Sequence, residues 1–95
     1  MNIVIIEDET PASTRLAKLL RQVIPGAKVL ATLDSIAAAQ DWFAANPAPE
    51  LVMMDIHLAD GSAFDLLQRI AIPAPIIFTT AYDQYALEAF KTNSI

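Results

Sequence analysis

Cysteine is absent from this 95-residue chain, and histidine occurs only once, as His57. Without thiols or a second imidazole, the chain cannot form a disulfide framework or a thiolate or polyhistidine zinc site. Glycine is almost as scarce, since only Gly26 and Gly61 are present. Dinucleotide-binding and phosphate-binding loops both need closely spaced glycines in a fixed frame. The sequence therefore excludes both kinds of nucleotide site.

Basic residues and long apolar runs are also lacking. Six lysines and arginines stand against eleven acidic residues, and the net charge is −5, which makes a nucleic-acid backbone an unfavourable ligand. No apolar run approaches the roughly 20 residues that cross a bilayer. What the chain does have is 55% hydrophobic residues, enough for one domain with a packed core. We expect a soluble, cytoplasmic protein with no membrane partner.

Four short apolar runs alternate with amphipathic stretches. The runs cover residues 3–6, 28–32, 51–54 and 75–80. Continuous apolar strands that alternate with helices through short connections are typical of a parallel sheet covered on both faces. The pattern therefore predicts an α/β fold, a doubly wound parallel sheet with right-handed crossovers, in which 28–32 is an edge strand.

The amphipathic stretches predict four helices. In the first, we expect Thr10 as N-cap, Pro11 as the first helical residue and Pro25-Gly26 as the stop. Its expected buried face is Leu16, Leu19, Leu20, Val23 and Ile24. Asp34 or Ser35 caps the second helix, which ends at Asn46-Pro47. The inward residues expected in the second, third and fourth helices are Ile36, Ala39 and Phe43; Phe64, Leu67 and Ile70; and Ala86, Ala89 and Phe90.

Acidic and hydroxyl residues follow three of the predicted strands. Glu7 and Asp8 follow the first strand, Asp55 follows the third, and Thr79-Thr80 end the fourth. In an open α/β sheet, the site lies beyond the carboxyl ends of the strands, so these groups should converge. Carboxylates gathered in this way repel one another unless a cation joins them, and hard oxygen ligands suit Mg²⁺.

Asp55 is the best candidate for a nucleophile at this site. It ends an apolar strand and has no adjacent carboxylate, whereas Glu7 and Asp8 are better placed to hold the metal. A carboxylate beside Mg²⁺ can attack phosphorus and form an aspartyl phosphate. The metal and a hydroxyl or amide would stabilise charge on the transferred oxygens.

Three motifs in this order resemble the receiver domain of bacterial two-component response regulators. They are residues 3–9, residues 53–58 with Asp60-Gly61, and residues 77–82. Residues 80–83 and 85–90 most resemble the regulators that carry a LytTR-type DNA-binding domain. The resemblance covers the whole chain and implies a flavodoxin-like sheet with strand order 2-1-3-4.

The resemblance also implies roles for individual residues. Asp55 would accept a phosphoryl group from a sensor histidine kinase, and Thr80 would be the switch hydroxyl. Mg²⁺ would be held by Glu7, Asp8, Asp55 and the backbone carbonyl of His57. His57 and Tyr82 would flank the site and influence access of the hydrolytic water.

The chain departs from the family pattern in two ways. Glu7 stands where an aspartate is commoner, although its longer side chain should still reach the metal through water. The fifth strand, with its aromatic switch residue and phosphate-pairing lysine, should follow Ile95, and Lys91 in the fourth helix cannot replace that lysine. We therefore expect residues 1–95 to be a receiver domain truncated before its fifth βα unit. DNA would be contacted only through a missing C-terminal domain.

Simpler interpretations of these residues stay open. Residues 7–9 could be a solvated turn before a helix, Asp55 could cap a local turn, and Thr80 could merely end a strand. A small Mg²⁺-dependent phosphatase would also use an aspartyl nucleophile, but it usually has a second acid where His57 stands. Alternatively, the chain is a phosphorylation-incompetent fragment. In either state, the exposed side of the fourth strand and fourth helix predicts a homodimer or higher self-association.

Overall fold

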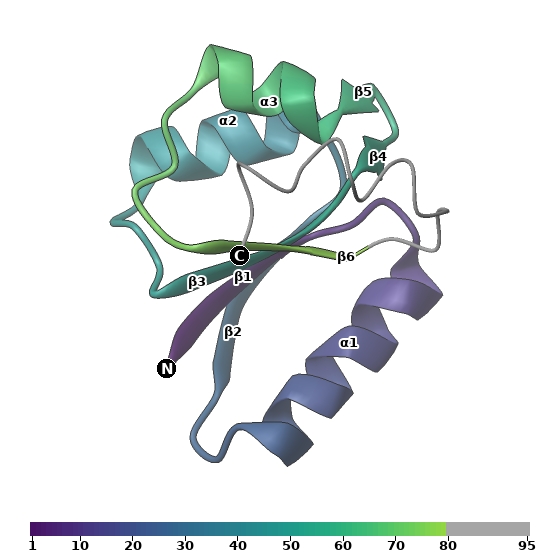
Figure 1. Cartoon of the computed structure of the whole chain (residues 1–95), viewed down its shortest axis with the longest axis vertical. Helices are drawn as coiled ribbons and strands as arrows, with labels where there is room; N and C mark the ends of the chain where they lie inside the picture. Colours follow the sequence, from purple (N-terminus) through teal and green to yellow (C-terminus); the bar gives the residue numbers. More distant parts are fainter. Residues whose placement is uncertain (80–95) are drawn as a thin grey trace.

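A four-stranded parallel sheet forms the middle layer of the molecule, in the order β2-β1-β3-β6. The computed structural model describes residues 1–79. The sheet strands are β1 (Asn2–Ile6), β2 (Lys28–Leu33), β3 (Leu51–Asp55) and β6 (Ile76–Thr79). Helix α1 (Thr10–Val23) covers one face, and helices α2 (Ile36–Ala45) and α3 (Ala63–Arg69) cover the other (Figure 1). The predicted flavodoxin-like arrangement is confirmed, because β6 is the fourth strand of this sheet along the chain.

Strand β1 lies at the centre of the packing. Its residues Ile3, Val4, Ile5 and Ile6 have no exposed surface, and β2 and β3 flank the strand on either side. Because side chains alternate along a strand, Val4 and Ile6 pack with the α2 and α3 layer. Ile3 and Ile5 pack with α1. Two hydrophobic layers thus fix β1 from both sides, and β2 is at the predicted edge.

Helix α1 begins one residue earlier than the sequence predicted. Glu9 is the N-cap, its backbone carbonyl accepts a hydrogen bond from Ser13 N at 3.0 Å, and Thr10 is already helical. The prediction of Thr10 as N-cap is therefore wrong. Pro11 is tolerated one position further in, because the first turn of a helix needs no intrahelical N–H donor there. The helix ends before Pro25, as expected.

The buried face of α1 also differs from the prediction. Ser13, Ala17 and Leu20 face the sheet, whereas Leu19 is 48% exposed and Val23 is 73% exposed. Residues spaced by three and four from Ser13 form the sheet-facing stripe. Leu19 and Val23 lie roughly 100° further round the helix from that stripe. Leu16 and Ile24 are partly buried against the core.

Helices α2 and α3 are both fixed by side-chain caps. Ser35 caps α2, with its hydroxyl accepting from Ala38 N at 3.0 Å, so the choice between Asp34 and Ser35 is resolved. The inward positions Ile36 and Ala39 are confirmed as buried, and Phe43 packs against the core.

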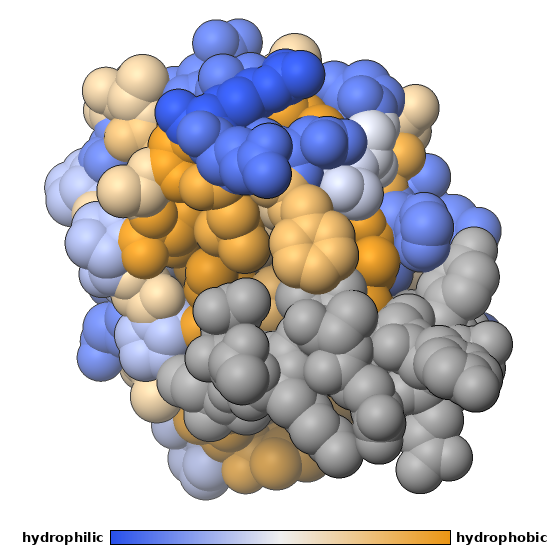
Figure 2. All heavy atoms as spheres, turned by 45° about the horizontal axis from the view of Figure 1, so that its top comes forward, coloured by the Kyte–Doolittle hydropathy of each residue, from blue (hydrophilic) through white to orange (hydrophobic). Residues whose placement is uncertain are grey.

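A capping box between Ser62 and Asp65 starts helix α3. This start turns Ala63 and Leu66 into the core, while Leu67 and Ile70 are partly buried against it. Phe64 is 41% exposed, so its predicted inward position is wrong, because it lies one position round the helix from Ala63. Hydrophobic side chains also gather at the surface on the side of α2 and α3 (Figure 2).

A small antiparallel hairpin lies between β3 and α3, where the sequence suggested only a loop. It consists of β4 (His57–Leu58) and β5 (Gly61–Ser62). Gly61 has φ +149°, and a Cβ on it would lie 2.7 Å from Ile36 Cδ1 and 2.8 Å from Asp65 Oδ2. The hairpin is therefore pressed closely against the start of α2.

Thr80, Tyr82, Lys91 and the fourth helix expected near Asp83 lie outside the described residues. Within residues 1–79, no helix is both long enough and apolar enough to cross a membrane.

Two glycine substitutions test the tight packing of the hairpin. Gly61→Ala adds a methyl group that meets Ile36 and strains a positive φ, so we expect a loss of about 2–4 kcal/mol in the free energy of unfolding. Gly26→Ala is the control, because Gly26 also has a positive φ (+82°) but open space around it, and should cost about 1 kcal/mol. Urea unfolding of both variants measures the difference. Equal losses would show that the hairpin is not closely packed.

Candidate metal centre

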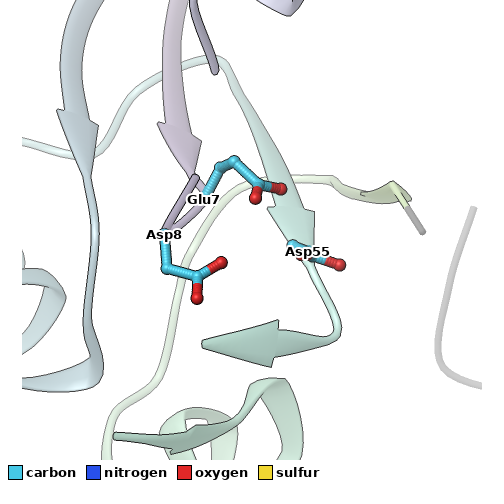
Figure 3. A group of neighbouring side chains, drawn as sticks. All are labelled: Glu7, Asp8 and Asp55. Atoms are coloured by element: carbon cyan, nitrogen blue, oxygen red, sulfur yellow. The ribbon is translucent and has the colours of Figure 1, made fainter. Parts of the chain in front are cut away.

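Three carboxylates meet where β1 and β3 end. The two strands are adjacent and parallel, and Ile6 pairs with Met54, so the residues that follow each strand arrive side by side. Glu7 and Asp8 come from the end of β1, and Asp55 comes from the end of β3 (Figure 3). Each offers an oxygen within 4.8 Å of an oxygen of the other two. The predicted convergence of these three side chains is confirmed in the geometry.

Glu7 is held in place by backbone hydrogen bonds on either side of the strand end. Its N–H donates to Leu33 O in β2 at 2.8 Å, which extends the sheet pairing past β1. Its Oε1 accepts from Glu9 N at 3.1 Å, across the turn into α1. Glu7 is only 9% exposed, whereas Asp8 is exposed. The solvated-turn interpretation of residues 7–9 therefore fails for Glu7.

Asp55 is partly buried at the end of β3. Its Oδ1 accepts a hydrogen bond from Ile56 N, the next residue, at 2.7 Å. Such a contact is the local turn bond that the simpler interpretation of Asp55 expected. It also restrains the carboxylate, one oxygen of which lies within 4.8 Å of oxygens of Glu7 and Asp8. The bond is thus compatible with both a structural and a chemical role.

Burial and the neighbouring carboxylates make Glu7 harder to ionise. The pKa of Glu7 is raised from 4.5 to about 7, chiefly because burial disfavours its charged form. The Glu9 N–H opposes this shift, while a hydrogen bond to Asp55 and the charges of Asp55 and Asp8 add to it. Concentrated negative charge of this kind is relieved by a proton or by a cation.

The donor set fits a hard divalent cation. Three carboxylate oxygens from Glu7, Asp8 and Asp55 lie close enough to share one ion. Mg²⁺ is bound in proteins by one or two carboxylates together with waters and phosphoryl oxygens. The partly open site leaves room for such further ligands, because Asp8 is exposed and an open hollow lies beside it.

Polar and charged residues from three further elements also line this hollow. His57 in β4 and Thr79 at the end of β6 lie beside the acids, with Thr79 paired to Asp55 in the sheet. Arg15, on the second turn of α1, contributes a positive charge. Arg15 is exposed on α1, so helical periodicity alone gives it no role at the site. Its position one turn into a helix that starts at the acidic cluster was the available signal.

No family model matches the chain, but several curated proteins are similar to it in sequence. The chain is 40% identical to the sensory transduction protein LytT of Enterococcus faecalis, over 99% of this chain and 39% of that protein. It therefore spans less than half the length of this relative. It is 37% identical to the positive alginate biosynthesis regulatory protein of Pseudomonas aeruginosa, again over 39% of the relative.

A solved structure matches over most of both chains. The response regulator REC domain of PhyR from Erythrobacter litoralis has a TM-score of 0.75 and 34% identity, covering 95% of this chain and 70% of that one. This match points to the same family as the motifs at residues 3–9 and at residues 53–58 with Asp60-Gly61. The parallel sheet and the acidic residues at its strand ends agree with it. The chain belongs to the receiver-domain family of response regulators.

Proposed function

We propose that residues 1–95 act as the phosphoacceptor receiver of a two-component response regulator, with Asp55 as the residue that is phosphorylated. The observation that supports this role is the convergence of Glu7, Asp8 and Asp55 at the ends of two adjacent parallel strands. On this proposal, a sensor histidine kinase donates the phosphoryl group. The protein is a cytoplasmic signalling component, and its only chemistry is its own phosphorylation and dephosphorylation.

The transfer follows from the position of Asp55. One carboxylate oxygen attacks the phosphorus, the bond from phosphorus to the kinase imidazole breaks, and the imidazole nitrogen keeps that electron pair and takes up a proton. The Ile56 N–H holds Oδ1 of Asp55, so the carboxylate is oriented before the phosphoryl group arrives. Orientation of this kind lowers the barrier because it need not be established during the reaction.

Glu7 and Asp8, with Asp55 and the backbone carbonyl of His57, would hold Mg²⁺ beside this oxygen. When bound, Mg²⁺ neutralises charge on the phosphoryl oxygens. Glu7 is the buried member of the set and Asp8 the exposed one, so Glu7 would hold the ion from the inner side of the site and Asp8 from the outer side. Thr80 would supply the switch hydroxyl, directly after Thr79 at the rim of the hollow.

The partners follow from the same proposal. Any DNA contact would be made by a further domain, since the chain spans 39% of its LytT relative. Within residues 1–79, β6 is the edge strand of the sheet at the end opposite β2. We propose self-association of the chain through the side of β6 and the predicted fourth helix, as a homodimer or higher oligomer.

Phosphorylation is tested by intact mass after incubation with acetyl phosphate and Mg²⁺. We expect one added phosphoryl group on the parent chain and none on Asp55→Asn, because the amide is not a nucleophile for phosphorus. Asp41→Asn is the control, since Asp41 is an exposed aspartate on α2 away from the carboxylate cluster. An unmodified parent chain with Mg²⁺ bound would contradict the proposal. Turnover of a simple phosphate ester would instead support a phosphatase.

The acidic cluster also predicts how stability depends on pH without metal. The pKa of Glu7 is raised to about 7 in the folded chain, so folding favours its protonated form. The stability that this proton provides is complete below about pH 4.5 and is lost as the pH rises through about 7. We expect a loss on the order of 2 kcal/mol, less than the full shift implies, because the site opens to screening solvent.

Urea unfolding at pH 4.5 to 8 in a chelator measures this loss against Glu7→Gln, which cannot ionise. The free energy of unfolding of the parent should fall relative to that of Glu7→Gln as the pH rises. Excess Mg²⁺ should restore the stability of the parent at pH 8. Parallel pH profiles for the two chains would show that Glu7 ionises without a penalty.

A further inference from the structure

Asp60 makes a contact that links the hairpin beside the carboxylate cluster to helix α2. It lies in the turn between β4 and β5, and its two oxygens accept backbone hydrogen bonds from the first residues of α2. Oδ1 accepts from Ile36 N at 2.7 Å and Oδ2 accepts from Ala37 N at 3.2 Å. The pKa of Asp60 is lowered chiefly by the Ile36 N–H, so the carboxylate bridges the two elements in its charged form.

Helix α2 already has a cap of its own. The hydroxyl of Ser35 accepts from Ala38 N at 3.0 Å. The bonds from Asp60 therefore add a second cap, and this one comes from a residue 24 positions further along the chain. A local cap satisfies the helix end alone. A distant cap also fixes the segment from which it comes.

Other contacts hold the same segment, residues 56–62, against its neighbours. Leu58 is buried in the cluster that includes Ile36. Gly61 lies so close to Ile36 that a Cβ would clash with it. Ala63 N donates to Ile56 O at 2.8 Å, which closes the base of the hairpin. Among these contacts, the carboxylate of Asp60 provides the polar bridge to α2.

The other end of this segment belongs to the carboxylate cluster. Ile56 N donates to Oδ1 of Asp55, and His57 lines the hollow beside the acids. A shift of the hairpin would therefore move the donor that orients Asp55. Mg²⁺ requires nearly ideal octahedral geometry, and groups that orient its ligands commonly affect metal affinity.

We propose that Asp60 is a positioning residue that ties the 56–62 segment to helix α2 and so holds Asp55 and His57 in the arrangement that binds Mg²⁺. This inference rests on the proposed function. Coupling of this kind is reciprocal, so Mg²⁺ binding should strengthen the Asp60 contact by the same factor by which the contact strengthens Mg²⁺ binding.

Ser35→Ala is the matched control for Asp60→Ala. Both substitutions remove a side-chain cap from the same helix, but only Asp60 connects that helix to the segment beside the carboxylates. Asp60→Asn is the conservative variant, because its amide oxygen can still accept from Ile36 N. Each chain is compared by thermal unfolding, by calorimetric titration with Mg²⁺, and by hydrogen exchange of the Ala63 amide without metal.

We expect Asp60→Ala to weaken Mg²⁺ binding by about 3- to 10-fold and to accelerate exchange of the Ala63 amide. Ser35→Ala should lower the midpoint of thermal unfolding by about as much as Asp60→Ala does. It should leave the Mg²⁺ affinity and the Ala63 exchange rate at the parent level. Asp60→Asn keeps the bond from Ile36 N but loses the one from Ala37 N, because an amide NH₂ replaces the second oxygen. Its Mg²⁺ affinity should therefore lie between those of Asp60→Ala and the parent. If Asp60→Ala does not fold, this smaller loss relative to Ser35→Ala is the test.

Equal Mg²⁺ affinities for Asp60→Ala and Ser35→Ala would overturn the inference and leave Asp60 as a helix cap only. Failure of the parent chain to bind Mg²⁺ would instead overturn the proposed function, and with it the proposed influence of Asp60 on Mg²⁺ affinity. The tether itself would then be judged by Ala63 exchange, where equal rates in Asp60→Ala and Ser35→Ala would refute it.

Discussion

Holding the buried carboxylate of Glu7 beside those of Asp8 and Asp55 is the constraint that shapes the site. Parallel pairing of β1 with β3 makes their meeting unavoidable, because both strands end at the same edge of the sheet. Ile3 to Ile6 of β1 are fully buried, and the hydrophobic clusters on both faces of the sheet hold the strand in place. The stability of the core thus offsets a local electrostatic cost, and that cost is what creates affinity for a cation.

Glu7 and Asp55 are held in place by different parts of the fold. Glu7 is bonded to β2 and to the turn into α1, so its position follows the sheet. Asp55 depends on Ile56, which leads into a hairpin fixed to α2 and α3 by Asp60 and by the Ser62–Asp65 box. A change of charge at Asp55 would therefore act first on the hairpin and α2. This connection offers a physical route from the site to a surface helix.

Much of the fold and of the acidic cluster could be predicted from the sequence, because both depend on local patterns. Apolar runs ending in acids predicted the strands, and strand ends predicted the meeting of Glu7, Asp8 and Asp55. The orientation of α1 could not be read from hydrophobicity, since Leu19 and Val23 are apolar yet exposed. The bond from Asp60 to Ile36 spans 24 residues, and the raised pKa of Glu7 depends on burial. Neither leaves a local signal.

If the three carboxylates form one divalent-cation site, crystals of the chain grown with Mn²⁺, a substitute for Mg²⁺ with strong anomalous scattering, should reveal it. We expect a single strong anomalous peak coordinated by oxygens of Glu7, Asp8 and Asp55. The peak should be lost in crystals of Asp8→Asn combined with Asp55→Asn. A fully occupied peak elsewhere, with none between β1 and β3, would contradict it.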